Sequence, residues 1–329
     1  AASDVYKRQP FRYDFVGSFL RPANLKAARE GFENGKISAY ELKAVEDKEI
    51  ERLINKQKEL GYHVITDGEF RRATWHLDFM WGFDGVAHEK TKTGLPFHGE
   101  DAMIDDTYLC GKVGLSKVHP FVEHFKFVKQ FEDENTVAKQ TIPAPAQFIE
   151  QMIMPFALEN TSKYYDSTHK LAEDIANGYK KVIADLYDAG CRNLQLDDCS
   201  WGMLVDPRAE ELFGTDKKGL KDIQELLVEI NNLAIEDKPN DMTITTHVCR
   251  GNFHSTYASA GAYDSVAEAL FEKENVDAYY LEFDDERSGG FEPLAKVSGN
   301  KKVVLGLITT KSPVPVSYTH LRAHETDSY

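Results

Sequence analysis

Short apolar runs recur along the chain, and most of the segments between them are long enough to form helices. The runs are rich in β-branched, aromatic and aliphatic residues, and polar residues follow each of them, which is typical of buried β-strands. The pattern predicts seven strands, at residues 13–19, 63–70, 136–143, 192–198, 242–249, 278–285 and 302–309.

Between these predicted strands, apolar residues recur with the spacing of a helix. Between the third and fourth strands, apolar residues spaced by three or four, from Leu171 to Leu186, predict a helix that ends at Gly190. Residues 38–60 predict another helix, with Gly61 in the stop position. Strands that alternate with helices in this way indicate an α/β fold with a parallel sheet.

The kind of α/β fold follows from the motifs and the number of repeats. No Gly-x-Gly-x-x-Gly follows a strand, so the dinucleotide-binding version is not supported. The repeated strand–helix units with polar strand ends predict a (β/α)8 barrel of the TIM type, whose last β/α unit is missing from this chain. In such barrels the chemistry takes place at the carboxyl ends of the strands.

Three segments depart from the alternation. Residues 74–135 are rich in Gly, Trp and Phe, and they predict a long excursion over the mouth of the barrel. Residues 1–10 and 314–329 have no apolar period, and we interpret them as foreign tails. The remaining residues, 11–313, predict a single catalytic domain.

Composition and charge narrow the class of protein. A chain of 329 residues with 42% hydrophobic content can bury a sizeable core. The formal net charge of −15 argues against a general binder of nucleic acids or of membrane surfaces, and no apolar run is long enough for a membrane span. We therefore expect a cytoplasmic enzyme. Four cysteines in a chain of this length do not indicate a disulfide framework, so a His paired with a Cys favours metal chemistry.

Such a pair stands at the end of the fifth predicted strand. In TTHVCRGN (245–252), His247 and Cys249 point to the same side, because side chains alternate along a strand. Glu282 ends the next strand, so neighbouring strands would present all three side chains to one point. Zinc accepts nitrogen, thiolate and carboxylate ligands together. Because short motifs often occur by chance, the residues alone leave a zinc site and a structural role about equally favoured.

Several motifs, taken in order, resemble those of the cobalamin-independent methionine synthase family, and most closely its short bacterial form that lacks the N-terminal half. They are FVGSFLRP (15–22), ITDGEFRR (65–72), LQLDDCSW (194–201), THVCRGN (246–252), YYLEFDDERSG (279–289) and LGLITTKSP (305–313). The resemblance implies that His247, Cys249 and Glu282 bind Zn²⁺, with a further Cys from an eighth strand that this sequence lacks. It also implies that the thiolate of homocysteine accepts a methyl group to form methionine.

The resemblance further implies how the amino acid is held. Glu69 and Asp197 would bind the ammonium group of homocysteine, and the backbone of Gly17 and Ser18 would position its carboxylate. From the residues alone, Glu69 could instead pair with Arg71 or Arg72, and Asp197 or Asp198 could cap the following helix.

The methyl donor that the resemblance implies is 5-methyltetrahydrofolate in its polyglutamate form. Its N5 atom must be protonated as the methyl group departs, which requires a general acid. The family has a His before Ser-Pro in the motif after the seventh strand, whereas this chain has Lys311 in TTKSP. This departure leaves open a methylcorrinoid donor or another thiol acceptor. A zinc-independent decarboxylase of the uroporphyrinogen type and an inactive fragment are the remaining alternatives.

Overall fold

The computed structural model describes residues 14–91, 95–97, 100–102, 104–312 and 314. The two segments interpreted as foreign tails therefore lie outside the described residues, apart from Val314, and that interpretation stays a prediction. No helix in the described part of the chain combines the length and the apolar character that crossing a bilayer requires.

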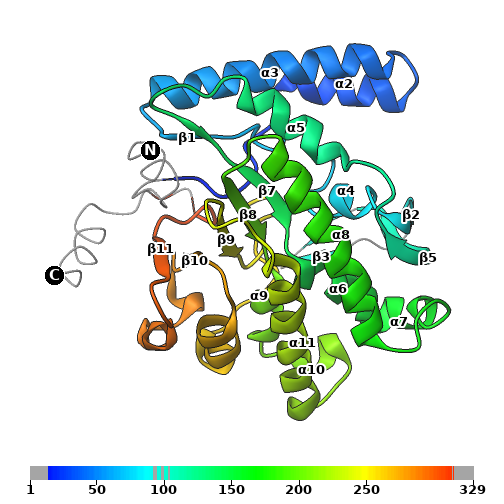
Figure 1. The fold of residues 1–329 in the computed structure, drawn as a ribbon, viewed down its shortest axis with the longest axis vertical. Coiled ribbons are helices and arrows are strands. Elements are labelled where there is room, and N and C mark those ends of the chain that lie inside the picture. The colour runs from blue at the N-terminus through cyan, green and yellow to red at the C-terminus, as the bar shows by residue number, and fades with distance from the viewer. Residues whose placement is uncertain (1–13, 92–94, 98–99, 103, 313, 315–329) are drawn as a thin grey trace.

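All but the first of the predicted strand regions contain parallel strands (Figure 1). A two-stranded sheet consists of β1 (Val64–Ile65) and β6 (Val137–Ala138). A five-stranded sheet consists, in chain order, of β7 (Gln140–Pro143), β8 (Asn193–Asp197), β9 (Thr243–Val248), β10 (Ala278–Glu282) and β11 (Lys302–Gly306). Only Lys139 separates β6 from β7, so one stretch of chain continues from the first sheet into the second.

The order of the strands is the order of the chain, and each strand is parallel to the next. This is the arrangement of the wall of a (β/α)8 barrel. Within the described residues no ladder joins β11 to β1. The structure is therefore of the predicted α/β class, and closure of the barrel stays a prediction.

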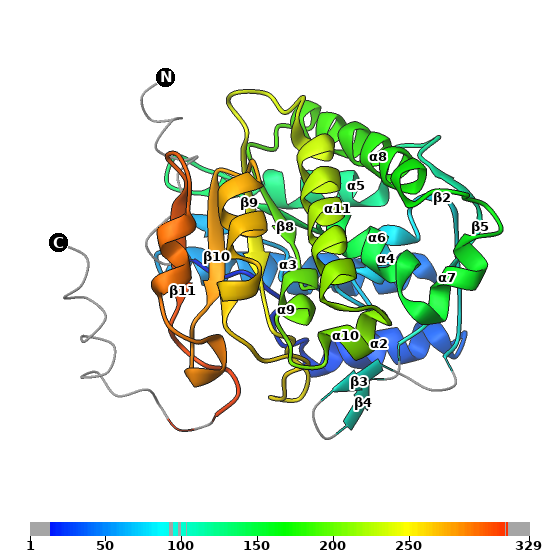
Figure 2. The same ribbon diagram turned by 90° about the horizontal axis from the view of Figure 1, so that it is seen from below.

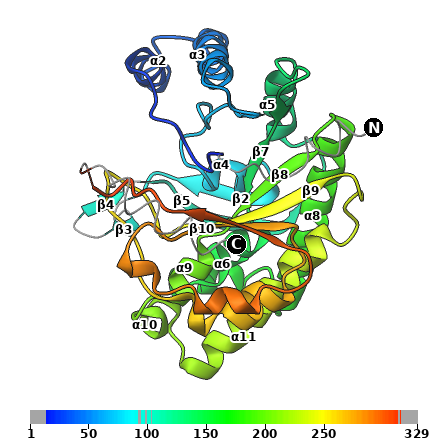
Figure 3. The ribbon, with the colours of Figure 1, turned by 90° about the vertical axis from the view of Figure 1, so that its left-hand side faces the viewer.

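Helices lie on both sides of the strands (Figure 3). On one side of the five-stranded sheet are α6 (Pro145–Ile153), α8 (Thr168–Asp188), α11 (Lys217–Ile235) and the short π-helix η2 (Glu268–Lys273). On the other side are α2 (Ala23–Glu33), α3 (Ala39–Glu59) and α5 (Pro120–Lys129). Of these, α3 contacts β1 and α5 contacts β6.

The two faces of the five-stranded sheet differ in polarity, because side chains alternate along each strand. The face toward α8 and α11 carries buried apolar side chains: Leu194, Leu196, Ile244, Val248 and Leu281. The opposite face carries polar side chains: Gln195, Asp197, Thr245, His247, Tyr280 and Glu282. A polar inner face is the first sign that this side of the sheet serves chemistry and not only packing.

The first predicted strand, at 13–19, is wrong for its described residues, which form no strand. Side chains from the sheet occupy carbonyls that a neighbouring strand would otherwise use. Lys139 Nζ donates to Phe15 O at 2.7 Å, and Gln195 Nε2 donates to Val16 O at 2.7 Å. The segment is thus held by side-chain donors instead of a ladder.

Both predicted helices form with the expected ends. In α3, Ser38 and Glu41 make a reciprocal capping box, and Gly61 follows the last turn with φ of 81°. Gly190 follows α8 with φ of 94°.

The excursion at residues 74–135 has elements of its own, which its irregular pattern does not reveal. It contains the short helix α4 (Leu77–Met80), an antiparallel pair of β2 (Asp84–Glu89) with β5 (Asp106–Gly114), the pair of β3 (Leu95–Phe97) with β4 (Glu100–Ala102), and α5. Figures 2 and 3 show β3 and β4 projecting on the same side of the molecule as the carboxyl ends of β9 and β11.

Candidate functional site

The carboxyl ends of β8, β9 and β10 bring the predicted metal ligands to one side of the sheet. Asp197 of β8 pairs in register with His247 of β9, which in turn pairs with Tyr280 of β10. Cys249 directly follows the last residue of β9, and Glu282 is the last residue of β10, so both stand at the carboxyl ends of neighbouring parallel strands. The sequence prediction that these strand ends converge is therefore supported by the register.

His247 is oriented by a carboxylate. Its Nδ1 atom lies 3.0 Å from Asp197 Oδ1. Burial lowers the pKa of His247, but the hydrogen bond to Asp197 and the negative charges around it raise the pKa above its ordinary value. Asp197 therefore faces the site. Asp198 is buried, and its Oδ1 accepts from Ser200 N at 3.3 Å at the start of the short helix α9 (Ser200–Leu204), whose N-cap residue Cys199 makes no side-chain cap.

Cys249 has a thiol neighbour. Its pKa is lowered, chiefly because the Cys199 thiol donates a hydrogen bond to its sulfur. The positive charge that His247 can carry also lowers this pKa, whereas burial and the carboxylate of Glu282 oppose the effect. The mutual influence of these side chains shows that the three predicted ligands share one electrostatic environment.

The carboxylate of Glu282 already has three partners, a backbone N–H and two basic side chains. Its Oε2 accepts from Arg250 N at 2.9 Å, and its Oε1 lies 3.2 Å from Arg287 Nη2 and 3.5 Å from Lys311 Nζ. Over the described ranges, no three His, Cys, Asp or Glu side chains stand in positions to hold one metal ion. The donor types and their common side of the sheet fit zinc; for Glu282 to bind such an ion, its carboxylate would have to release Arg287 and Lys311.

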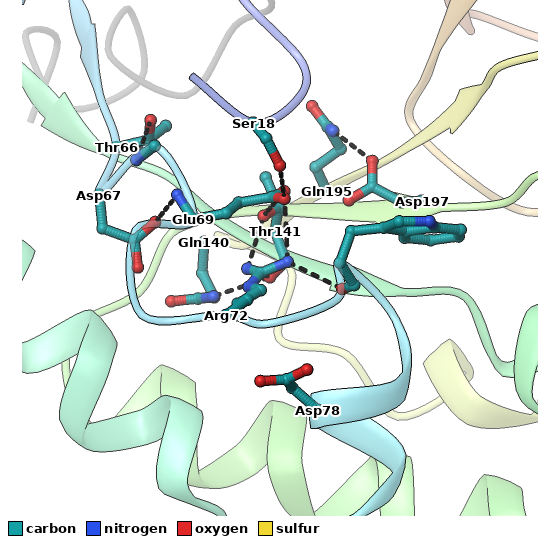
Figure 4. Close-up of polar contacts among 12 residues, drawn as sticks. Ser18, Thr66, Asp67, Glu69, Arg72, Asp78, Gln140, Thr141, Gln195 and Asp197 are labelled. Carbon is teal, nitrogen blue, oxygen red and sulfur yellow. Dashed lines mark hydrogen bonds and ion pairs between the residues drawn. The ribbon is translucent and has the colours of Figure 1, made fainter. Parts of the chain in front are cut away.

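A second cluster surrounds Glu69 in the loop after β1 (Figure 4). The side chain is buried, and Ser18 Oγ donates to its Oε2. Its Oε1 accepts from Thr141 Oγ1 at 3.2 Å and lies 3.2 Å from Arg72 Nη1. The pairing with an arginine that the sequence left open is thus present with Arg72, whereas Arg71 pairs with Glu46 and Asp47 instead.

Two carboxylates act on each other at this site. Burial raises the pKa of Glu69, Arg72 lowers it, and the negative charge of Asp197 raises it again. Arg72 forms the ion pair with Glu69 and makes its other hydrogen bonds to Thr141 and to Trp75 O, while Arg21 Nη2 donates to the backbone oxygen of Glu69 at 2.9 Å. A further cation close to both carboxylates would therefore be stabilised.

Gly17 and Ser18 are exposed next to Glu69. A Cβ added at Gly17 would meet no atom within 4 Å, so the backbone there can be approached closely. The structure thus brings Gly17, Ser18, Glu69 and Asp197 into one region. That they contact a substrate is implied by the family resemblance and stays a prediction.

Gly68 gives the loop its shape. Its φ is 61°, and an added Cβ would collide with the Leu53 side chain. Glu69 itself has φ of 61°, an uncommon value for a residue other than glycine, and one that is often found where function requires it.

We expect Gly68→Ala to destabilise the protein more than Gly35→Ala does. Both glycines have positive φ, but an added Cβ at Gly35 meets open space. The left-handed backbone alone should cost Gly35→Ala about 1 kcal/mol of unfolding free energy, and crowding should bring Gly68→Ala to about 2–4 kcal/mol. Urea unfolding of both variants measures the difference. Equal losses would show that Leu53 yields without cost.

The three tryptophans differ in their surroundings. Trp201 is completely buried, so it cannot stack on a bound donor. Trp81 stacks on His88 with ring centroids 3.8 Å apart and donates to Thr107 Oγ1 at 2.9 Å. Trp75 stacks on His76. Packing accounts for Trp81 and Trp201.

Sequence reasoning assigned no role to four residues that complete the site: Lys139, Thr141, Gln195 and Cys199. The sequence did contain signals for three of them. Thr141 and Gln195 are polar residues within buried strands, and they pair in register between β7 and β8. Cys199 follows Asp197 by the same two residues by which Cys249 follows His247.

Comparisons with known proteins show the family to which the chain belongs. The family model described as cobalamin-independent synthase, catalytic domain, matches residues 13–93 and 136–326. The uncharacterized protein YxjH of Bacillus subtilis (strain 168) is 40% identical over 311 residues, which cover 94% of this chain and 80% of that protein. The matched residues of the family model include every predicted substrate and metal residue.

Two solved structures are similar in fold. One, described as a putative vitamin-B12 independent methionine synthase from Listeria monocytogenes, has a TM-score of 0.76 and 38% identity, covering 97% of this chain and 86% of that chain. The other, a B12-independent methionine synthase from Shewanella sp. W3-18-1 in complex with selenomethionine, has a TM-score of 0.61 and 20% identity, covering 85% of this chain and 74% of that chain.

Proposed function

Because the chain belongs to the family of cobalamin-independent methionine synthase catalytic domains, we propose that it transfers a methyl group to the thiol of L-homocysteine and so forms methionine. The observation that carries the proposal is the placement of two buried carboxylates, Glu69 and Asp197, beside the exposed backbone of Gly17 and Ser18, where Ser18 Oγ donates to Glu69 Oε2 (Figure 4). An α-amino acid carries a cation and an anion on the same carbon atom, and this region offers partners for both.

In this proposal the residues have separate tasks. Glu69 and Asp197 bind the ammonium group, whose charge relieves the repulsion between the two carboxylates. Ser18 and Thr141 hold the Glu69 carboxylate in place through their hydroxyls. The backbone at Gly17 and Ser18 receives the substrate carboxylate, because the absence of a Cβ at Gly17 leaves room for it.

We propose Zn²⁺ as the cofactor, held by His247, Cys249 and Glu282. When bound, zinc lowers the pKa of a thiol that coordinates it, which makes thiolate available at neutral pH. Asp197 supports this assignment, because its hydrogen bond to Nδ1 leaves Nε2 of His247 as the nitrogen that faces an ion. Cys199 keeps Cys249 disposed to the thiolate form in which it binds metals.

The proposed methyl donor is 5-methyltetrahydrofolate in its polyglutamate form, and a methylcorrinoid is the second candidate. Lys311 is the reason to retain a methylcorrinoid as a candidate donor. It stands where the family has a histidine, and it is paired with Glu282. The TIM-type (β/α)8 barrel, the cytoplasmic location and the absence of nucleic-acid and membrane partners belong to the same proposal.

The test is a methyl-transfer assay with the full chain, L-homocysteine and Zn²⁺. Separate reactions contain 5-methyltetrahydrofolate with one glutamate, the same folate with three glutamates, or methylcobalamin, and mass spectrometry measures methionine. We expect the most methionine with the triglutamate. If methionine forms only with methylcobalamin, the donor is a methylcorrinoid and not the folate. If no donor yields methionine, the proposed function is contradicted.

A further inference from the structure

Lys139 is a buried lysine whose three donors all have partners. The residue is 4% exposed, and it lies between β6 and β7, where it points to the inner face of the sheet. Its Nζ lies 3.0 Å from Asp14 Oδ2, 2.7 Å from Phe15 O and 3.1 Å from Gln195 Oε1. Because an ammonium group has three hydrogens, these contacts fix its position completely.

Gln195 continues the network toward the substrate region. It is completely buried, and its Nε2 donates to Val16 O at 2.7 Å and to Asp197 Oδ1 at 2.6 Å. An amide nitrogen has two hydrogens, so both are used, while the amide oxygen accepts from Lys139. One side chain therefore connects the segment before Gly17 to a carboxylate of the site.

The segment depends on these contacts for its place, since residues 14–19 form no strand. Besides Lys139 and Gln195, Tyr280 OH donates to Asp14 Oδ2 at 2.9 Å, and Phe19 N donates to Gly68 O at 3.1 Å. The two carbonyls that Lys139 and Gln195 bind lie directly before Gly17.

We propose that Lys139 and Gln195 are positioning residues that set the distance between the Gly17–Ser18 backbone and Asp197. This inference rests on the proposed function, because those two groups receive the carboxylate and the ammonium of the substrate. In an α-amino acid a single carbon separates these two groups, so the distance decides whether such a substrate is accepted. Neither positioning residue touches the substrate.

The network leads to a specific choice of variants. Gln195→Glu keeps the shape of the side chain but removes both donated hydrogen bonds and places a negative charge against Asp197. Lys139→Met keeps most of the length and removes the charge. The matched controls are Gln130→Glu and Lys126→Met, which alter exposed side chains on or next to α5.

The measurements are the KM for L-homocysteine, kcat, and the Kd of L-methionine by calorimetry. We expect both variants to raise KM and Kd by about tenfold or more, as the loss of a charge-assisted hydrogen bond does, while kcat changes by less than about threefold. If Lys139 and Gln195 only stabilised the fold, their variants would unfold at a lower temperature, and KM would not rise while kcat stays nearly unchanged. If Lys139→Met does not fold, Tyr280→Phe, which removes only the hydroxyl that holds Asp14, should raise KM in the same sense.

The outcomes separate this inference from the proposed function. If the wild-type protein binds neither L-homocysteine nor L-methionine, the proposed function fails and the inference falls with it. If the wild-type protein binds both and Gln195→Glu and Tyr280→Phe bind them equally well, only the inference is overturned.

Discussion

Replacement of His247 by alanine is expected to abolish zinc binding and methionine formation together. The imidazole is one of the three proposed ligands, and its ring is held by Asp197 at 3.0 Å, so no other side chain can supply the same nitrogen. Losing one of the protein ligands should weaken zinc binding by about a hundredfold or more, since even the loss of an outer partner of a ligand costs 10–100-fold. Elemental analysis and competition with a chelator measure zinc content and affinity.

His169→Ala is the matched control for this variant. His169 is an exposed histidine, and it lies 3.2 Å from Glu229 on the surface. The control should retain the zinc content and the activity of the wild type. Retention of zinc with unchanged affinity by His247→Ala would remove His247 from the site, and it would direct the search for ligands to other side chains.

The second large effect is expected from Glu69→Gln. The variant keeps the size of the side chain and one of its two acceptor oxygens, so it can accept from Ser18 or from Thr141 but not from both, and it removes the charge that we assign to the ammonium group of homocysteine. It also leaves Arg72 without its ion pair. Breaking a buried charge pair at a binding site costs about 2–5 kcal/mol, so kcat/KM for homocysteine should fall by about thirtyfold to several thousandfold.

Asp67→Asn separates this effect from a general loss of charge in the loop. Asp67 is buried two residues away, and its Oδ1 accepts from Glu69 N at 2.8 Å. Asparagine can keep that hydrogen bond, so the control should retain kcat/KM within about threefold. Steady-state kinetics with varied homocysteine test both variants. An equal loss in the two variants would show that loop structure, and not the Glu69 charge, determines activity.

The elements of the sheet were predictable because their signals are local. Alternating side chains along β8, β9 and β10 identify the strands and also place Asp197, His247 and Glu282 on one side. The capping box at Ser38 and the glycine at 61 likewise lie within a few residues of the helix ends that they define. Patterns that extend over only a few neighbouring residues can be recognised in a single sequence.

The segment at 14–19 shows why the rest was not predictable. Its apolar and aromatic residues resemble a strand, yet its carbonyls bond to Lys139 and Gln195, which are more than a hundred residues away in the sequence. No local pattern reports such partners. The short strands within 74–135 were not predicted for a related reason, since β2 pairs with β5 across a long connection.

The sequence by itself determined the α/β class, the positions of most strands, and the side of the sheet on which the polar residues of the site lie. Only the tertiary structure decided which partners those residues have: Arg72, Ser18 and Thr141 for Glu69, and Arg250, Arg287 and Lys311 for Glu282. The physical reason is that backbone periodicity acts over a few residues, whereas the hydrogen bonds and ion pairs of a buried carboxylate depend on how distant segments pack.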